Sequence, residues 1–146
     1  ARSWDYIQHM QKKEGYNLIG IKQNMRKKEA YRNVIDYAGQ KFGKLDILVN
    51  NVGMNIRKKT EEYTREEYEQ ILHTNLSSAF EMSRYALPLL KESESASIIN
   101  VSSVAGQKHL KTGSVYGMTK AAMIQLTKNL ACEWAPYKIL VNALAH

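Results

Sequence analysis

The sequence predicts an α/β fold, a partial doubly wound parallel sheet with helices on both faces. Two observations support this prediction. Short, almost continuously apolar segments alternate with longer segments in which apolar residues recur every three to four positions. Apolar runs of this kind suit strands of a parallel sheet that is buried on both faces. Their alternation with helices gives the β-α-β order of doubly wound sheets.

The first part of the chain is expected to contain two helices and two strands. Residues 4–13 and 29–42 have apolar side chains at helical spacing, and Gly15 and Gly43 are expected to end these helices. The expected strands are residues 18–21 and 45–49.

The second part is expected to contain two longer helices. Thr64 and Glu67 resemble a capping box that opens a helix reaching about Leu90, and Pro88 is expected to kink or end its last turn. Another helix is expected over residues 114–134. The expected strands are residues 97–101 and 139–144.

Composition limits the classes of function. The chain has 146 residues, about one ordinary domain, and a formal net charge of +7. No apolar run approaches the ~18 residues of a membrane span, and Cys132 cannot form an internal disulfide because it is the only cysteine. A reducing, cytoplasmic compartment fits this cysteine usage. No membrane contact is expected.

The charged and histidine residues also argue against several kinds of site. The basic clusters are short, dispersed and mixed with acids, which favours solvated faces and leaves open a phosphate-bearing ligand. No nucleic-acid recognition motif accompanies them, so no nucleic-acid partner is expected. The four histidines show no metal-ligand spacing, and no metal is expected.

The pattern that best indicates chemistry is Ser103, Tyr116 and Lys120. Tyr116 and Lys120 are four residues apart on a predicted helix and therefore share a face. A free phenol has a pKa near ~10, and a neighbouring ammonium group favours the phenolate and lowers that pKa. Ser103 follows a predicted strand, at the edge where open α/β sheets place ligands. The set suits a proton-transfer step that accompanies hydride transfer.

Each of these residues also has a plain structural interpretation. A Tyr and a Lys four residues apart often form only a solvated helix face. Ser103 could cap a turn, and Asn75 could satisfy backbone groups. Asn50 and Asn51 are common strand-ending residues.

Several motifs, taken together and in this order, resemble the short-chain dehydrogenase/reductase family, and within it the plant tropinone-reductase-like branch. The resemblance covers essentially the whole chain and implies a Rossmann-like fold. The matching segments are residues 46–53, 74–76, 101–106, 116–120 and 141–143, with residues 88–91 and 130–135 indicating the plant branch.

The resemblance implies four catalytic roles. Tyr116 would be the acid/base for the substrate oxygen, and Lys120 would lower the pKa of Tyr116 and hold the nicotinamide ribose. Ser103 would hydrogen-bond the substrate oxygen. Asn75 would hold a water molecule that connects Lys120 to solvent.

The resemblance also implies a cofactor site for NADP, with NAD as the alternative. The adenosine side of the cofactor would be lined by Asn51, Val52 and Gly53. The nicotinamide side would be contacted by Tyr116 and Lys120. Gly53 would permit close approach of the backbone to the cofactor. Asn24 stands where an aspartate usually contacts the adenine ring. Val52 replaces the usual alanine.

Residues 1–146 are expected to form a single partial domain. Relative to the family pattern, the chain lacks the N-terminal Gly-rich phosphate loop and the C-terminal substrate lid. An exposed sheet edge and marginal stability are the expected consequences.

The functional hypothesis is an NADP(H)-dependent oxidoreductase that interconverts a ketone and a secondary alcohol. Its partners would be a small carbonyl or alcohol substrate, near the loop that carries Arg57, and a second copy bound through the two long helices. The alternative is a catalytically inactive truncated remnant or isoform that retains these dimerisation helices.

Overall fold

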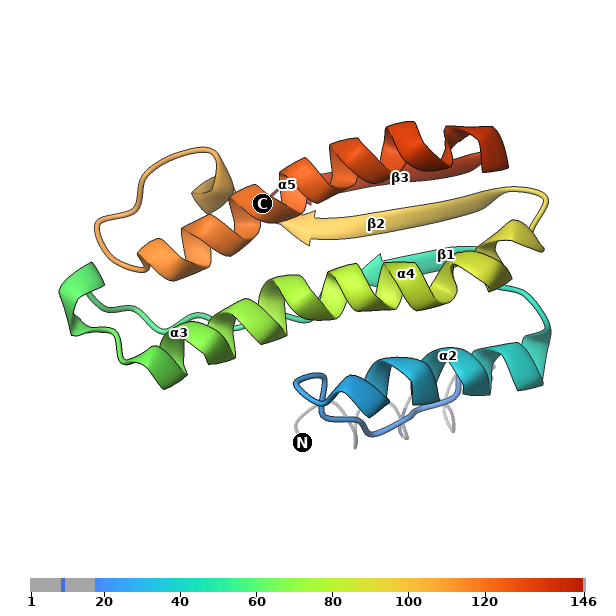
Figure 1. Ribbon diagram of the computed structural model, residues 1–146, viewed down its shortest axis with the longest axis horizontal. Helices are drawn as coiled ribbons and strands as arrows, with labels where there is room; N and C mark the ends of the chain where they lie inside the picture. Colours follow the sequence, from blue (N-terminus) through green and yellow to red (C-terminus); the bar gives the residue numbers. More distant parts are fainter. Residues whose placement is uncertain (1–8, 10–17, 146) are drawn as a thin grey trace.

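The computed structural model describes residue 9 and residues 18–145, and its centre is a three-stranded parallel sheet (Figure 1). The strand order is β1-β2-β3, and Ile98 lies opposite both Leu48 and Val141. The strands are β1 (Ile47–Asn50), β2 (Ala96–Ser102) and β3 (Ile139–Ala145). The predicted α/β class with a parallel sheet is therefore confirmed.

Within the described residues, four α-helices accompany the sheet, close to their predicted positions. The helices are α2 (Lys28–Phe42), α3 (Arg65–Leu72), α4 (Ser78–Lys91) and α5 (Ser114–Trp134), with the π-helical turn η2 (His73–Ser77) and the 3-10 turns η1 (Thr60–Glu62), η3 (Val104–Gly106) and η4 (Ala135–Tyr137). Gly43 ends α2 in the left-handed conformation, as its position predicts. Across the described ranges, no helix combines the length and apolar character needed to cross a bilayer.

The long helix predicted from Thr64 is interrupted in the structure. The capping box is present, since Thr64 Oγ1 accepts from the Glu67 amide and Glu67 Oε2 accepts from the Thr64 amide, at 3.2 and 3.0 Å. Between α3 and α4, however, the turn η2 is π-helical and contains Asn75. Such π-bulges occur often at functional sites. Pro88 lies in the last turn of α4, which ends at Lys91.

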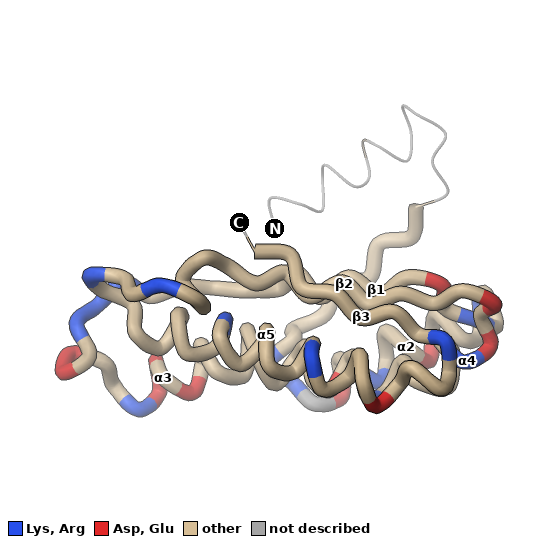
Figure 2. The backbone as a smooth tube through the Cα atoms, turned by 90° about the horizontal axis from the view of Figure 1, so that it is seen from above, with Lys and Arg blue, Asp and Glu red and all other residues tan. Residues whose placement is uncertain are grey.

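Helices α4 and α5 lie against one face of the sheet, and α2 packs on α4 on the same side (Figure 2). Leu48, Ile98 and Val141 point into the core on that face. The alternate strand residues are exposed, for example Ile47 at 58% and Leu140 at 63%. The prediction of helices on both faces is therefore met for one face only within residues 18–145.

The predicted strand at residues 18–21 is wrong. This segment has no regular secondary structure, and Leu18, Ile19 and Ile21 are exposed. A strand needs a hydrogen-bonding partner, and the only ladders in the described sheet join β1 to β2 and β2 to β3. The helix predicted at residues 4–13 lies outside the described residues, apart from His9.

A buried network of polar side chains joins the sheet to the helices that pack on it. Asn50 Nδ2 donates to Ser83 Oγ at 3.1 Å and to Asn100 Oδ1 at 2.8 Å. Asn100 Nδ2 donates to Thr127 Oγ1 at 2.9 Å. These bonds join β1, β2, α4 and α5, because one residue comes from each element. Asn50 is thus more than a strand-ending residue.

Candidate active site

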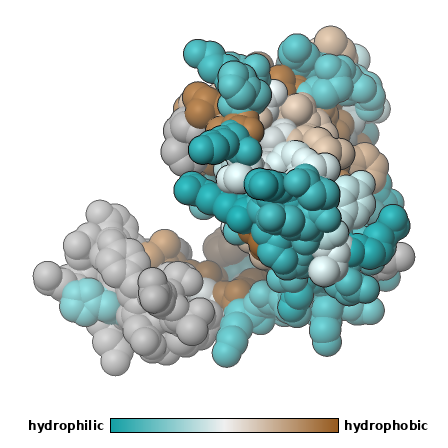
Figure 3. Space-filling model, turned by 90° about the vertical axis from the view of Figure 1, so that its left-hand side faces the viewer, coloured by the Kyte–Doolittle hydropathy of each residue, from teal (hydrophilic) through white to brown (hydrophobic). Residues whose placement is uncertain are grey.

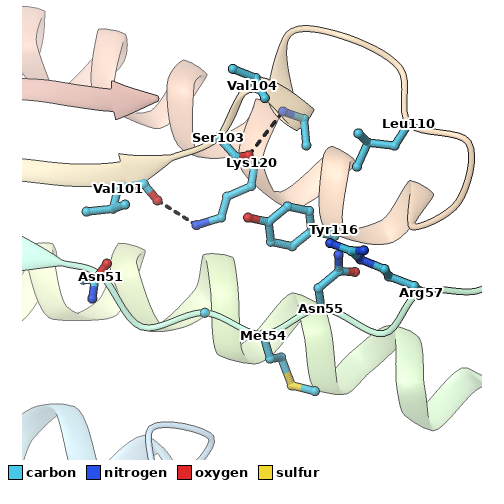
Figure 4. A pocket seen from close by; sticks show the side chains of 12 residues that line it. Asn51, Met54, Asn55, Arg57, Val101, Ser103, Val104, Leu110, Tyr116 and Lys120 are labelled. Carbon is cyan, nitrogen blue, oxygen red and sulfur yellow. Dashed lines mark hydrogen bonds between the residues drawn. The ribbon is translucent and has the colours of Figure 1, made fainter. Parts of the chain in front are cut away.

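A cavity of about 400 Å³ lies at the carboxyl ends of β1 and β2 (Figure 4). Its walls come from the loop after β1, the end of β2 with η3, and the start of α5. The lining residues are Asn51, Gly53, Met54, Asn55, Arg57, Val101, Ser103, Val104, Ala105, Leu110, Tyr116 and Lys120. Five residues predicted for the site therefore share one cavity: Asn51, Gly53, Ser103, Tyr116 and Lys120.

Lys120 is held by two consecutive residues of β2. Its side chain is buried, and Nζ donates to the Val101 carbonyl at 2.6 Å. Ser102 Oγ donates to the Lys120 carbonyl at 2.8 Å. Burial lowers the pKa of Lys120, because removal from water disfavours its charged form. The amine is therefore fixed in place, and its protonated form is less favoured than it would be in solution.

Tyr116 lies one helical turn before Lys120 and faces the same cavity. Lys120 Nζ is 5.7 Å from the centre of the Tyr116 ring. Figure 4 shows the phenol oxygen directed toward the Lys120 side chain. The shared face expected from the four-residue spacing is therefore present in α5.

Ser103 caps a turn and also lines the cavity. Its Oγ accepts from the Ala105 amide at 3.3 Å, and its carbonyl accepts from the Gly106 amide at 2.9 Å. A Cβ on Gly106 would lie only 2.7 Å from the Ala121 nitrogen. The absence of a side chain at Gly106 thus lets η3 pack directly on α5, which helps to place Ser103 in the same cavity lining as Tyr116.

Asn75 contacts the cavity wall without lining the cavity. Its Oδ1 accepts from the Met54 amide at 2.7 Å, and its Nδ2 donates to the Met54 carbonyl at 2.9 Å. The same Nδ2 donates to Thr119 Oγ1 at 3.1 Å. A Cβ on Gly53 would lie 3.6 Å from both Asn75 Oδ1 and Lys120 Nζ. Asn75 therefore fixes the loop after β1 beside Lys120.

Two residues predicted to bind the cofactor lie elsewhere. Val52 lines a separate pocket of about 50 Å³ together with Met25. Asn24 lines neither this pocket nor the larger cavity, and its Oδ1 accepts from the Arg26 amide at 3.2 Å. The described structure does not bring these two side chains to the residues on α5.

Thr119 is a site residue that the sequence analysis missed. Its hydroxyl donates to the Tyr116 carbonyl at 2.8 Å and accepts from Asn75, while the side chain is almost completely buried. It thereby links the turn of α5 that carries Tyr116 to Asn75, whose side chain hydrogen-bonds the Met54 backbone. The available signal was its place directly before Lys120 and four residues from Val115 and Met123, which are also buried in α5.

The arrangement provides the groups needed to bind and protonate an oxygen atom. A phenol and a hydroxyl line one cavity, and a fixed amine lies behind the phenol. Gly53 leaves the wall beside Lys120 without a side chain, which fits the close approach of a nicotinamide cofactor. The donor set therefore suits proton transfer to or from a carbonyl or alcohol oxygen.

Comparisons with known proteins agree with this chemistry. A family model described as short chain dehydrogenase matches residues 2–146. A tropinone reductase homolog of Arabidopsis thaliana is 59% identical over 103 residues, or 70% of this chain and 39% of that protein. Senescence-associated protein 13 of the same plant is 56% identical over 102 residues, or 70% of this chain and 38% of its own length.

A solved structure extends the likeness to three dimensions. The crystal structure of a short-chain dehydrogenase from Streptomyces avermitilis matches 99% of this chain with a TM-score of 0.88 and 29% sequence identity. The match covers 53% of that chain. The present chain thus spans about half of this structure and less than half of the two plant relatives.

Proposed function

This chain belongs to the short-chain dehydrogenase family, and on that premise we propose that it is part of an NADP(H)-dependent oxidoreductase that interconverts a ketone and a secondary alcohol. The observation that supports the proposal most is the single cavity lined by Ser103, Tyr116 and Lys120. The substrate would be a small carbonyl or alcohol compound that enters this cavity.

Tyr116 moves the proton in the proposed reaction. During reduction its phenol donates a proton to the substrate oxygen, and during oxidation the phenolate accepts the proton back. Ser103 orients the substrate oxygen through its hydroxyl. A nicotinamide cofactor supplies or accepts the hydride when it is bound.

Lys120 acts beside Tyr116 without contacting the substrate oxygen. Its bonds to β2 fix the amine next to the phenol, where a positive charge favours the phenolate. The amine also holds the cofactor's ribose in the proposal. Asn51 and Gly53, which line the same cavity, would contact the cofactor, whereas Asn24 and Val52 would contribute on its adenosine side.

The proposed choice of NADP rests on the resemblance to the tropinone-reductase-like relatives. Asn75 is proposed to position a water molecule near Lys120, and its place beside Gly53 supports that role. Because its side-chain amide already bonds Met54 and Thr119, we expect such a water to contact the backbone of η2 as well.

The long helices offer a surface for a second copy of the chain. Phe80 on α4 and Met118 on α5 are large apolar side chains with exposed fractions of 46% and 55%. We propose a homodimer that buries these side chains. Sedimentation of wild type and a Phe80→Glu, Met118→Glu variant tests it, since only wild type should sediment as a dimer.

Titration with NADPH and NADH, followed by fluorescence or calorimetry, tests the cofactor assignment. We expect saturable binding that is tighter for NADPH and is weakened in Lys120→Met. Leu140→Ala, which changes an exposed residue of β3, is the control and should bind as wild type does. A folded sample that binds neither cofactor at millimolar concentration would contradict the proposal and favour a catalytically inactive chain.

A further inference from the structure

The cavity carries positive charge without a carboxylate to balance it. Arg57 and Lys120 are the charged residues among its described lining, which contains no Asp or Glu. Lys120 is buried, bonded to the Val101 carbonyl and has a lowered pKa. Arg57 is exposed and brings a positively charged guanidinium group to the cavity lining. Arg57 therefore dominates the charge that an entering ligand meets.

The backbone on both sides of Arg57 is held in place. The Ile56 carbonyl accepts a hydrogen bond from the Tyr63 hydroxyl, and the Lys58 carbonyl accepts one from the Gly113 amide at 3.0 Å. Gly113 directly precedes α5, so the loop is tied to the helix that carries Tyr116. Figure 4 shows the Arg57 guanidinium directed toward the Tyr116 ring. The position of Arg57 at the cavity is thus built into the fold.

Two of the acidic residues near Arg57 in sequence have other partners. Glu67 pairs with Lys58 Nζ at 2.6 Å, and Glu62 accepts from the Lys59 amide at 3.1 Å. None of the ion pairs found within residues 18–145 includes Arg57. This end of the molecule is largely hydrophilic, with apolar patches between the polar side chains (Figure 3). Arg57 is therefore available to a ligand.

The other walls limit what such a ligand can be. Met54, Val104 and Leu110 contribute apolar surface to the lining of the cavity. A guanidinium fork matches a carboxylate with two parallel hydrogen bonds. A protonated amine would meet a like charge at the same place.

We propose, building on the proposed function, that the substrate is a carbonyl or hydroxy compound that carries a carboxylate on a short apolar framework. Arg57 binds the carboxylate, and Ser103 and Tyr116 bind the reacting oxygen. Ketones that carry a protonated amine are disfavoured by the same charge.

Three cyclohexanones of similar shape test this substrate class: 4-oxocyclohexanecarboxylate, its carboxamide, and 4-(dimethylamino)cyclohexanone in its protonated form. Dissociation constants are measured by calorimetry with NADP+ present, which has no hydride to transfer to the ketone, and NADPH-dependent reduction is measured separately. We expect the carboxylate to bind on the order of 10-fold more tightly than the carboxamide, with the cation weakest. Arg57→Gln should abolish this preference and leave NADPH binding unchanged, and Arg57→Lys should retain part of it.

Lys59→Gln is the matched control, since it removes a nearby exposed cation that does not line the cavity. Equal binding of carboxylate and carboxamide, no binding of either, or loss of the preference in Lys59→Gln as well would overturn the inference. Reduction of all three ketones without a carboxylate preference would overturn it and leave the proposed function standing. Preferential carboxylate binding without reduction would support the inference and overturn the proposed function.

Discussion

The two faces of the sheet differ sharply, although both are built from the same three strands. On the face beneath the helices, Ile98 is fully buried and Leu48 and Val141 are nearly so. On the opposite face, Val49 and Leu144 have exposed fractions of 53% and 57% in the described structure. Both sets are apolar, as expected for strands covered on both sides. The apolar composition of a strand therefore shows that both of its faces could be buried. Which face is buried depends on the elements that pack against it.

The difference between the packed and the exposed face also explains which residues of the candidate site are held in place by hydrogen bonds. Ser103, Tyr116 and Lys120 come from elements that pack on the covered face or end beside it. Ser102 and Val101 hydrogen-bond Lys120, and Thr119 hydrogen-bonds Tyr116. Val52 and Asn24 lack such bonds to α5 within the described residues. The part of the cavity lined by Ser103, Tyr116 and Lys120 is therefore built by elements of the packed face.

A pair of matched truncations tests the difference between the faces and should give the largest stability effect. Ile98→Ala is expected to lower the free energy of unfolding by about 2–5 kcal/mol, because it leaves a cavity in the core. Leu140→Ala should change it by less than about 0.5 kcal/mol, because its side chain is already exposed. Urea unfolding of both variants measures the contrast. Equal losses would show that the second face is also packed in solution.

Two glycines test whether close packing or backbone freedom supports the site. Gly106→Ala would bring a Cβ against the backbone of α5, and we expect a loss of about 1–3 kcal/mol together with weaker substrate binding. Gly43→Ala meets no atom within 4 Å but has a φ of 72°, so it should cost about 1 kcal/mol and leave binding unchanged. Unfolding and ligand titration are measured together. Unchanged substrate binding in Gly106→Ala would show that the site does not depend on the contact between Gly106 and α5.

The buried amine gives a smaller, pH-dependent effect. Burial lowers the pKa of Lys120 in the folded state, whereas the unfolded value is near ~10.4. Between these two values the unfolded chain binds more protons, so stability rises with pH through this window, and the full cost of burial applies below the folded pKa. Relative to Lys120→Met, wild type should therefore gain stability as the pH rises from the folded-state pKa of Lys120 toward ~10.4. If the free energy of unfolding changes with pH in the same way for both proteins, burial of the Lys120 amine does not contribute to the pH dependence of stability.

Local patterns predicted most of the fold. The helix over Ser114–Trp134 was placed correctly because apolar spacing, turn residues and length agree there. The turn η2 was not predicted, because it accompanies the contact between Asn75 and Met54, which are 21 positions apart. The segment at residues 18–21 has strand-like composition, but pairing depends on a neighbour that its own sequence cannot specify.

The site could be predicted where its residues lie on one element or at a strand end. Tyr116 and Lys120 share a helix face, and Ser103 follows a strand, so local rules place all three. The sequence analysis placed the loop that carries Arg57 near the substrate. The place of Arg57 at the cavity and the role of Thr119 needed the structure, since they depend on contacts of the loop after β1 with α5 and η2. The family resemblance drawn from the motifs is confirmed by the family model.

The most direct test of the central claim is the rate of NADPH-dependent ketone reduction by Tyr116→Phe. If Tyr116 transfers the proton, kcat/KM should fall by about 10²- to 10⁴-fold while circular dichroism shows an intact fold. Tyr137→Phe removes the hydroxyl of an exposed tyrosine outside the cavity and should retain the wild-type rate. A Tyr116→Phe protein whose kcat/KM stays within about 3-fold of wild type would contradict the account, because that change is far smaller than the loss of an acid/base group produces.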